Sequence, residues 1–387
     1  MQASSIVEFV RDIYRSNDFI PLHVPTFSGN EKKYVLETID STFVSSVGRY
    51  VDEFEKTVEG YTGSAKAVAT VNGTAALHTA LHMAGIVRGD LVITQALTFV
   101  ATCNALHHMG AEPVFCDVSP VSLGLCPKSV ENFLLEHAEI NDKGCFHKKS
   151  RQRIKAVVPM HTFGHPVELN ELISVCKKWH LILVEDAAES LGSFYKGQHT
   201  GTFGQFGVLS FNGNKVITTG GGGMVLCQSI EEGLHTKHVT TTAKVPHAYE
   251  FYHDEPGFNY RMPNLNAALG CAQMESLPDY LSHKRALAKH YQAFFEESDF
   301  KFVREPDYAQ SNYWLNAVMC PDVESRNCLL KETNDAGVMT RPIWQLMHRL
   351  PMFKNALRND LSQSEKIEAR LVNLPSTPVV VAELRHK

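Results

Sequence analysis

The sequence predicts an α/β protein whose large domain has a mainly parallel sheet, with helices on both faces. Between Ala67 and Val184, short apolar runs alternate with amphipathic segments, which is typical of consecutive βα units. After about residue 228 the alternation ends, and a long helical pattern leads into mixed strands and helices. We therefore expect a large domain over residues 1–250 and a smaller α+β domain over residues 251–387.

Local signals place the individual elements. Ser5 to Glu8 forms a capping-box pattern ahead of one apolar helical face, and Gly85 and Gly110 end two later helices. Prolines 21 and 25 keep their segment extended. The expected helices cover residues 5–14, 30–39, 51–61, 75–83, 98–109, 127–137, 168–179, 230–237, 262–295, 324–336 and 362–371. The expected strands cover residues 67–71, 91–94, 113–118, 154–159, 181–184, 206–211, 313–318 and 337–340. The polar stretches 139–153 and 239–256 are predicted to be loops.

Composition excludes several classes of function. The 387 residues carry a net charge of -5, so no basic excess is available to neutralise the phosphates of a nucleic acid. No apolar run approaches the roughly 20 residues that a membrane span needs, and the N-terminus lacks the pattern of a signal peptide. The nine cysteines include no CxxC pair, which predicts reduced thiols in a cytoplasmic protein and no metal site.

Two residues indicate a cofactor. Asp186 follows the apolar run Leu181–Val184, at the end of a strand where open α/β sheets place their ligands. Lys215 follows the next run, Phe206–Phe211, and precedes four glycines. A lysine amine and a carboxylate are what pyridoxal phosphate requires, because the amine forms a Schiff base and the acid keeps the pyridine nitrogen protonated. We predict that Asp186 and Lys215 hold this cofactor from two sides.

Five motifs resemble the DegT/DnrJ/EryC1/StrS aminotransferase family, and they occur in the family's order. They are NGTAALH (72–78), VEDAAES (184–190), SFNGNK (210–215), TTGGGG (218–223) and GFNYRMPNLNAALG (257–270). The resemblance runs from about residue 20 to the end of the chain. It implies a fold-type I pyridoxal-phosphate enzyme that aminates a nucleotide-linked keto sugar.

The resemblance also implies roles for particular residues. Lys215 and Asp186 become the catalytic pair, and Glu189 lies beside the phenolic oxygen of the cofactor. Because a glutamate there would repel a phenolate, it must be protonated or bonded through another group. The remaining cofactor contacts implied are Gly73, Thr74, Ala75, Phe99, Ser210 and Asn259. The implied substrate contacts are Ser46, His161, Arg261, Trp314, Arg341 and His348, and Arg341 and Trp344 together could bind a carboxylate or pyrophosphate and stack a base.

Each assignment has a plainer structural alternative. Thr74 could be an ordinary N-cap, Phe99 a core residue and His161 a surface histidine with its own partners.

Asn259 resembles an asparagine that reaches the phosphate from a neighbouring subunit, which implies a homodimer with shared active sites. The glycine run is not a dinucleotide-binding motif, and we expect it to let the backbone pass close to the cofactor.

The implied reaction transfers the amino group of L-glutamate to a sugar ketone. Three segments, FVSSVGRYVDEFE, HTFGHPVEL and TRPIWQLMHRLPMF, are most similar to the branch of the family that makes 4-amino sugars toward legionaminic acid and bacillosamine. This similarity favours a UDP-linked 2-acetamido-4-keto-2,6-dideoxyhexose, with GDP-4-keto-6-deoxymannose as the alternative. A dehydratase would have histidine in place of Lys215, and a non-catalytic sugar-nucleotide-binding regulator would be expected to lack Asp186 or Lys215.

Overall fold

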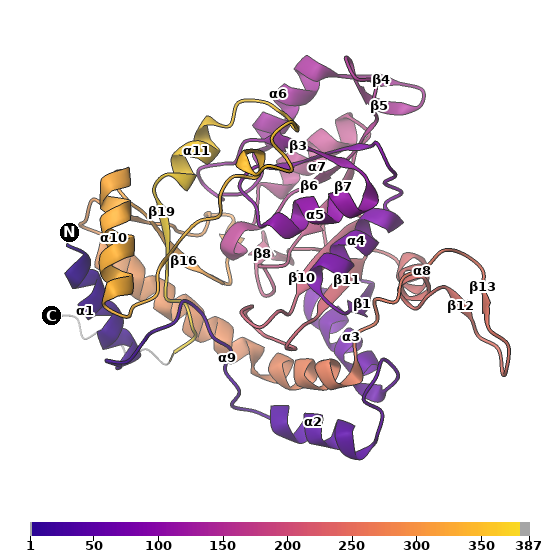
Figure 1. Cartoon of the computed structure of the whole chain (residues 1–387), viewed down its shortest axis with the longest axis horizontal. Coiled ribbons are helices and arrows are strands. Elements are labelled where there is room, and N and C mark those ends of the chain that lie inside the picture. The colour runs from indigo at the N-terminus through magenta and orange to yellow at the C-terminus, as the bar shows by residue number, and fades with distance from the viewer. Residues whose placement is uncertain (1, 380–387) are drawn as a thin grey trace.

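A computed structural model describes residues 2–379 and centres on one eight-stranded sheet (Figure 1). The strand order is β1-β11-β10-β7-β6-β2-β3-β18. These strands are β1 (Lys66–Thr70), β2 (Leu91–Gln95), β3 (Glu112–Cys116), β6 (Ile154–Val158), β7 (Ile182–Asp186), β10 (Phe206–Ser210), β11 (Gly223–Cys227) and β18 (Leu357–Arg358). Within this sheet β11 alone runs antiparallel to its neighbours, β1 and β10. The predicted mainly parallel sheet is confirmed.

Helices cover both faces of the sheet, as predicted. Val92 and the apolar residues of other strands on the same face pack against α4 and α5. Leu91 and Ile93 pack with α6 and α7 on the opposite face. The alternation follows from the pleat, which points successive side chains to opposite sides. The helices are α1 (Ala3–Tyr14), α2 (Glu31–Asp40), α3 (Arg49–Thr62), α4 (Gly73–Met83), α5 (Val100–Met109), α6 (Pro127–His137), α7 (Leu169–Lys178), α8 (Ile230–Thr240), α9 (Asn264–Phe295), α10 (Val323–Asp335) and α11 (Ser362–Glu368), with short 3₁₀ turns η1 (Thr162–Gly164) and η2 (Met347–Arg349).

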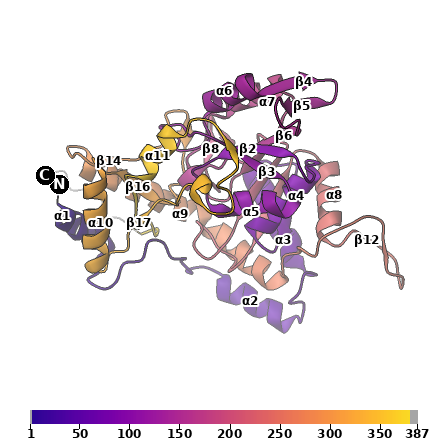
Figure 2. The ribbon, with the colours of Figure 1, turned by 45° about the horizontal axis from the view of Figure 1, so that its top comes forward.

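A second layer forms from the C-terminal part of the chain. Its antiparallel sheet has the order β14-β16-β19-β17, with β14 (Lys301–Phe302), β16 (Asn316–Met319), β17 (Arg341–Pro342) and β19 (Leu371–Leu374). Helix α1 lies beside α10 and shares a core with this sheet, as Figures 1 and 2 show from two directions. Conversely, strand β18 comes from the C-terminal part of the chain but belongs to the large sheet, where it pairs with β3. The chain thus crosses between the layers more than once, and the two-domain division near residue 250 stays a prediction.

Two stretches predicted as loops contain strands. Residues 139–153 include the hairpin β4 (Ala138–Asn141) and β5 (Gly144–His147), and residues 239–256 include β12 (Lys244–Val245) and β13 (Tyr252–His253). Because both hairpins are short and mostly polar, hydrophobic patterning gives little sign of them. The strand predicted over residues 337–340 is wrong, since Val338 makes only an isolated bridge to Ile20. Three short strands form a separate small sheet: β8 (Phe194–Tyr195), β9 (Gln198–His199) and β15 (Ala309–Gln310).

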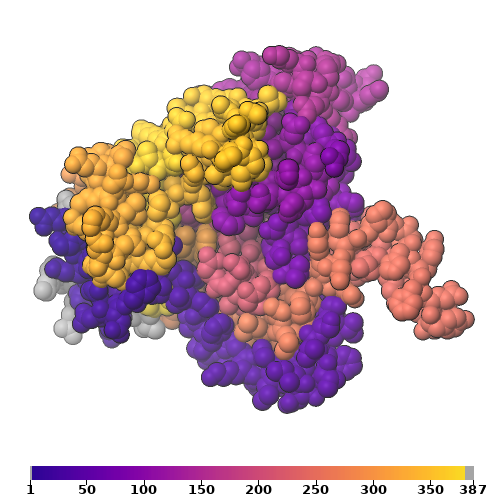
Figure 3. Space-filling model, viewed as in Figure 1, coloured from indigo at the N-terminus to yellow at the C-terminus, as the bar shows by residue number. Residues whose placement is uncertain are grey.

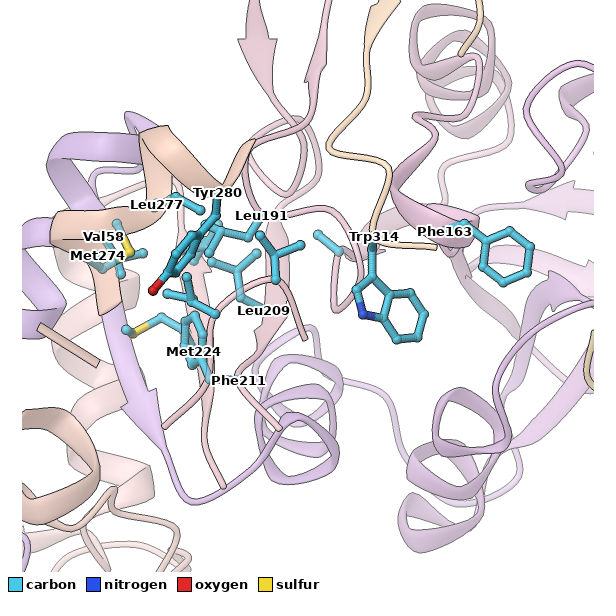
Figure 4. Packing of buried hydrophobic residues seen from close by; sticks show 14 of the residues in the cluster. Val58, Phe163, Leu191, Leu209, Phe211, Met224, Met274, Leu277, Tyr280 and Trp314 are labelled. Carbon is cyan, nitrogen blue, oxygen red and sulfur yellow. The ribbon is translucent and has the colours of Figure 1, made fainter. Parts of the chain in front are cut away.

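The largest hydrophobic core of the described residues connects helix α9 to the large sheet and continues to Trp314. Met274, Leu277 and Tyr280 of α9 pack over Leu209 of β10, and the core extends as far as Trp314 (Figure 4). The lysine-bearing turn after β10 is therefore supported by packed side chains. Among residues 2–379, no helix combines the length and apolar character needed to cross a membrane.

Candidate active site

A cavity of about 300 Å³ lies where strands β7 and β10 end and helix α4 begins. Most of the predicted cofactor residues line it. The lining residues are Asn72, Gly73, Thr74, Leu77, Phe99, Ala101, Met160, Asp186, Ala188, Glu189, Ser210, Asn212, Asn214, Lys215, Trp314 and Trp344. A larger groove of about 810 Å³ lies between α2, the segment 41–48 and α3, away from this group of acids and amine.

Asp186 is the last residue of β7 and is 4% exposed. The parallel register pairs it with Val208, so it lies next to the strand that carries Ser210. Its Oδ2 accepts a hydrogen bond from the Thr102 hydroxyl at 2.7 Å, and its Oδ1 accepts from the Ala188 N–H at 3.2 Å. Burial raises the pKa of Asp186, while the Thr102 hydroxyl and the Ala188 N–H oppose that rise. The carboxyl is therefore fixed in orientation on one side of the cavity.

Lys215 and Glu189 meet on another side of the cavity. The Lys215 Nζ lies 3.6 Å from Oε1 of Glu189, while Oε2 of Glu189 accepts from the Phe163 N–H at 2.9 Å. Burial raises the pKa of Glu189 to about 7, although the nearby Lys215 charge opposes the rise. Glu189 can therefore carry a proton near neutral pH, as its predicted position by a phenolic oxygen requires.

Trp314 fixes the direction of the lysine side chain. Lys215 Nζ lies 3.9 Å from the centre of the Trp314 ring, within range of a cation–π contact. The indole N–H donates to the Asn214 carbonyl at 2.6 Å. Behind it, the fully buried Lys284 donates to the Trp314 carbonyl at 3.1 Å. Trp314 thus connects the C-terminal layer to the turn that carries Lys215.

The start of helix α4 forms a third side. Its N-cap is Asn72, whose Oδ1 accepts from the Ala75 N–H at 2.8 Å. The plainer alternative of a Thr74 cap is therefore wrong, and Ala75 does not line the cavity. Gly73 and Thr74 do line it, beside Ser210, and a helix N-terminus with a hydroxyl is suited to an anion. A Cβ on Gly73 would lie 2.9 Å from the Cβ of Ser210, which explains the glycine.

Aromatic rings complete the wall. Phe99 is 48% exposed and lines the cavity, so it is not a core residue. Its ring meets Trp344 edge to face, with 6.2 Å between centroids. The open face is available to a planar ligand. Sequence reasoning had not placed Trp344 beside Phe99.

Glu185, which precedes Asp186, faces away from the cavity. Its Oε1 accepts from the N–H groups of Phe203 and Gly204 at 2.7 and 2.8 Å, and its Oε2 accepts from Gly201 at 2.8 Å. His161 lies 3.0 Å from the same Oε2. His161 is fully buried, and its Nδ1 accepts from the Val167 N–H, so the structure corrects its prediction as a substrate contact. The pair anchors the 201–204 loop to the sheet.

Five further predicted residues do not line this cavity within the described chain: Ser46, Asn259, Arg261, Arg341 and His348. Asn259 and Arg341 are exposed. One glycine of the run has a clear packing role. A Cβ on Gly223 would lie 2.4 Å from the Asn72 carbonyl oxygen, so this glycine lets β11 pass the start of α4, which forms one side of the cavity.

Sequence reasoning missed three contributors: Thr102, Asn72 and Asn214. Thr102 stands three residues after Phe99, one helical turn on, and this spacing could have placed both on one side of α5. The cap by Asn72 was visible as an asparagine before a helix. The Asn214 carbonyl contact depends on the fold and left no sequence signal.

These residues fit pyridoxal phosphate. A buried carboxyl, an amine, an aromatic face and a helix N-terminus with a serine surround one cavity, and each matches a different part of that cofactor. The fold and the site define the class of the protein, which is that of the fold-type I, pyridoxal-phosphate-dependent aminotransferases.

The chain belongs to the DegT/DnrJ/EryC1/StrS aminotransferase family, whose model matches residues 25–385. It is 34% identical over 360 residues to a GDP-perosamine synthase of Escherichia coli O157:H7, covering 93% of this chain and 94% of that protein. It is 31% identical over 294 residues to the spore coat polysaccharide biosynthesis protein SpsC of Bacillus subtilis (strain 168), covering 74% and 71% of the two chains. The crystal structure of an aminotransferase from Psychrobacter cryohalolentis superposes with a TM-score of 0.82 at 26% identity, covering 94% and 95%.

The comparisons settle the class that the sequence predicted. The protein is a pyridoxal-phosphate-dependent aminotransferase, and the predictions of family, fold-type I architecture, enzyme class and cofactor are confirmed.

Proposed function

We propose that the enzyme transfers the amino group of L-glutamate to the C4 ketone of a nucleotide-linked 4-keto-6-deoxy sugar. The observation that carries this proposal is the convergence of Lys215, Asp186 and Glu189 on one cavity. Support for a sugar acceptor comes from relatives such as the GDP-perosamine synthase of Escherichia coli O157:H7. The product would serve surface-polysaccharide or glycan synthesis.

Each residue of the site has a proposed task. When bound, the cofactor supplies an aldehyde that bonds to amines and a ring that accepts an electron pair. Lys215 Nζ removes the proton from the α-carbon of L-glutamate and later returns a proton to the sugar carbon. Asp186 keeps a proton on the pyridine nitrogen through a charge-assisted hydrogen bond, worth about 1.5–3 kcal/mol. Glu189 carries its own proton and donates it to the phenolic oxygen.

The cavity walls orient the ligands. Gly73, Thr74 and the Ser210 hydroxyl bind the phosphate, and Phe99 stacks on the ring. Trp314 directs the amine of Lys215 by the 3.9 Å contact. Because glutamate and the sugar use the same amine in turn, the kinetics should follow a ping-pong pattern.

We propose UDP-2-acetamido-4-keto-2,6-dideoxyhexose as the acceptor, on the similarity of the three segments quoted above. GDP-4-keto-6-deoxymannose is the second candidate, supported by the relatives that are perosamine synthases. A sugar-nucleotide-binding regulator is the third, and the "Pleiotropic regulatory protein" of Geobacillus stearothermophilus is 27% identical. Ser46, Arg261 and Arg341 remain candidates for the sugar-nucleotide end.

We also propose that the active unit is a homodimer located in the cytoplasm. Asn259 is exposed and lies outside its own chain's cavity, as a residue that reaches a second copy would. The nine cysteines are all free thiols, in keeping with a reducing compartment. Mixing inactive Lys215→Ala and Asn259→Ala chains should restore activity if each site takes one residue from each copy. No recovery in a mixed dimer would contradict shared sites.

The function is tested by the visible absorption spectrum of the purified enzyme. Wild type should show a cofactor band that L-glutamate bleaches and that the correct keto sugar restores. Lys215→Ala should lack both the band and turnover, whereas Lys128→Ala, which removes an exposed lysine of α6, should behave as wild type. Comparing UDP- and GDP-linked keto sugars identifies the nucleotide. If the cofactor band of the loaded enzyme is not bleached by any amino donor, the proposal fails, and a sugar-nucleotide-binding regulator becomes the favoured function.

A further inference from the structure

A second group of chemically active side chains lies outside the cavity, at the end of helix α8. His235 and His238 stand three residues apart on α8 and so share one helical face. Asp254 and Glu255 follow strand β13 and meet them there. The Nε2 of His235 lies 2.8 Å from Oε1 of Glu255, and the Nε2 of His238 lies 2.6 Å from Oδ1 of Asp254.

Three of the donor atoms are close enough to share one ion. His238 Nε2 is 4.0 Å from the same Oε1 of Glu255, and the ligand atoms of His238, Asp254 and Glu255 all lie within 4.8 Å of one another. In a tetrahedral zinc site with bonds of about 2.0–2.1 Å, neighbouring donors would be about 3.3 Å apart. Side-chain rotation would bring these three donors to that spacing, and His235, which contacts Glu255, would have to move further to become the fourth.

The chemistry of the donors suits a transition metal. Two imidazoles and two carboxylates give an N₂O₂ set that suits Zn²⁺, Ni²⁺ or Cu²⁺, and the two acids neutralise the charge of a divalent ion. The side chains of His235 and Asp254 are 52% and 48% exposed, so an ion can enter from solvent. The competing interpretation is that two separate histidine–carboxylate pairs only fasten one segment to another. That interpretation involves the same contacts but predicts no stoichiometric metal.

We propose that His235, His238, Asp254 and Glu255 form a site for a divalent transition-metal ion. The ion fastens the arm, defined as residues 244–253 with strands β12 and β13, to helix α8. Figures 1 and 3 show this arm projecting from the body of the molecule beyond α8. Metal binding therefore orders the arm, and the site is independent of the proposed function, since none of its four residues lines the active-site cavity.

The test measures zinc uptake by the full-length, cofactor-loaded enzyme after chelator treatment and removal of free cofactor. All variants carry Cys328→Ser, because Cys328 is an exposed thiol that could bind zinc by itself. Equilibrium dialysis against Zn²⁺ should give one more equivalent per chain for this parent than for the variant His235→Gln/His238→Gln. The control His107→Gln, which removes an exposed histidine of α5, should keep the full stoichiometry.

A second readout follows the arm itself. Trypsin cleavage after Lys244 should slow roughly 10-fold or more when Zn²⁺ is added to the parent, because the fastened arm opens less often. Zinc should give no protection to the double-histidine variant or to Asp254→Asn/Glu255→Gln, and circular dichroism is used to check that both variants are folded. Uptake should weaken as the solution is made more acidic, because protons compete with the metal for the imidazole and carboxylate donors.

Three results would overturn the proposal. The first is no zinc uptake by the parent, and the second is equal uptake by the parent and the double-histidine variant, which would indicate unselective surface binding. The third is selective uptake without protection of the arm, which would refute the claim that the ion fastens it.

Discussion

Replacing Glu185 with glutamine should destabilise the fold without altering any group that lines the cavity. The carboxylate is fully buried and receives three backbone N–H groups, from Gly201, Phe203 and Gly204, in addition to its contact with His161. Burial acts to raise the pKa of Glu185, but the His161 contact and the N–H donors of Gly204 and Gly201 hold it below its usual value. The buried charge is therefore satisfied on both oxygens.

The size of the effect follows from this geometry. A glutamine oxygen can keep the bonds from Phe203 and Gly204, but its NH₂ group would then face the Gly201 N–H, donor against donor. One buried unsatisfied donor costs about 1–3 kcal/mol, and bonds to a charged acceptor are each worth about 1.5–3 kcal/mol. The unsatisfied Gly201 donor and the loss of charge from the bonds that remain together give about 3–5 kcal/mol, which we take as the expected loss.

The assay is urea denaturation at pH 7.5, followed by circular dichroism. Glu185→Gln should lower the free energy of unfolding by about 3–5 kcal/mol. The control Glu139→Gln, which removes an exposed partner of Arg151, should change it by less than about 0.5 kcal/mol. Because the folded pKa of Glu185 is lowered, its contribution is present above the unfolded value of 4.5 and is lost as pH falls. A loss under about 1 kcal/mol at pH 7.5, or one that grows in acid, would refute this reasoning.

Three other substitutions test the cavity. Burial raises the folded pKa of Glu189 to about 7, so its contribution to stability is present below the unfolded pKa of 4.5 and is lost as pH rises through 7. Glu189→Gln should therefore flatten the decline of the melting temperature between pH 5 and 8 in enzyme freed of cofactor, and an unchanged slope would contradict the assignment. Gly73→Ala places a Cβ within 3.0 Å of the Ser210 Oγ and should weaken retention of the cofactor roughly 10-fold or more in dialysis; equal retention would show that the contact relaxes freely. Asp186→Asn keeps an acceptor for Thr102 and should slow bleaching by L-glutamate about 10- to 100-fold, corresponding to the loss of one charge-assisted bond, in stopped-flow absorption; wild-type rates would remove Asp186 from the mechanism.

Strand-end chemistry explains why much of the cavity could be predicted. Asp186, Ser210 and Phe99 stand just at or beyond apolar runs, and parallel strands bring their carboxyl ends to one edge. Lys215 needed the resemblance as well, because a lysine after a strand is usually only exposed. The sequence predicts the order of the strand ends along the chain. It does not predict which strand ends lie side by side, because that depends on how the strands pair in the sheet.

The misplacement of His161 and the opposite orientation of two adjacent acids, which was not predicted, have a common physical origin. Glu185 and Asp186 are adjacent acids, and the pleat points one to each side, so only Asp186 reaches the cavity. His161 looked like a site residue because its strand also ends at that edge, but its ring turns inward to Glu185. Contacts of this kind join residues far apart in sequence and are set by packing, which no local pattern records.

Pairing between β10 and the antiparallel strand β11 limits which part of the loop that carries Lys215 can move. The strand register pairs Ser210 with Gly223, and the Phe211 N–H donates to the Gly222 carbonyl at 2.9 Å. The two ends of the loop between β10 and β11 are therefore joined by hydrogen bonds. The backbone of Lys215 is held further by its N–H bond to the Asn212 carbonyl at 3.0 Å. The backbone that carries the Lys215 amine is thus held in place by these hydrogen bonds. In the reaction proposed above, the amine would therefore move toward and away from the cofactor by rotation of its own side chain, without movement of the loop.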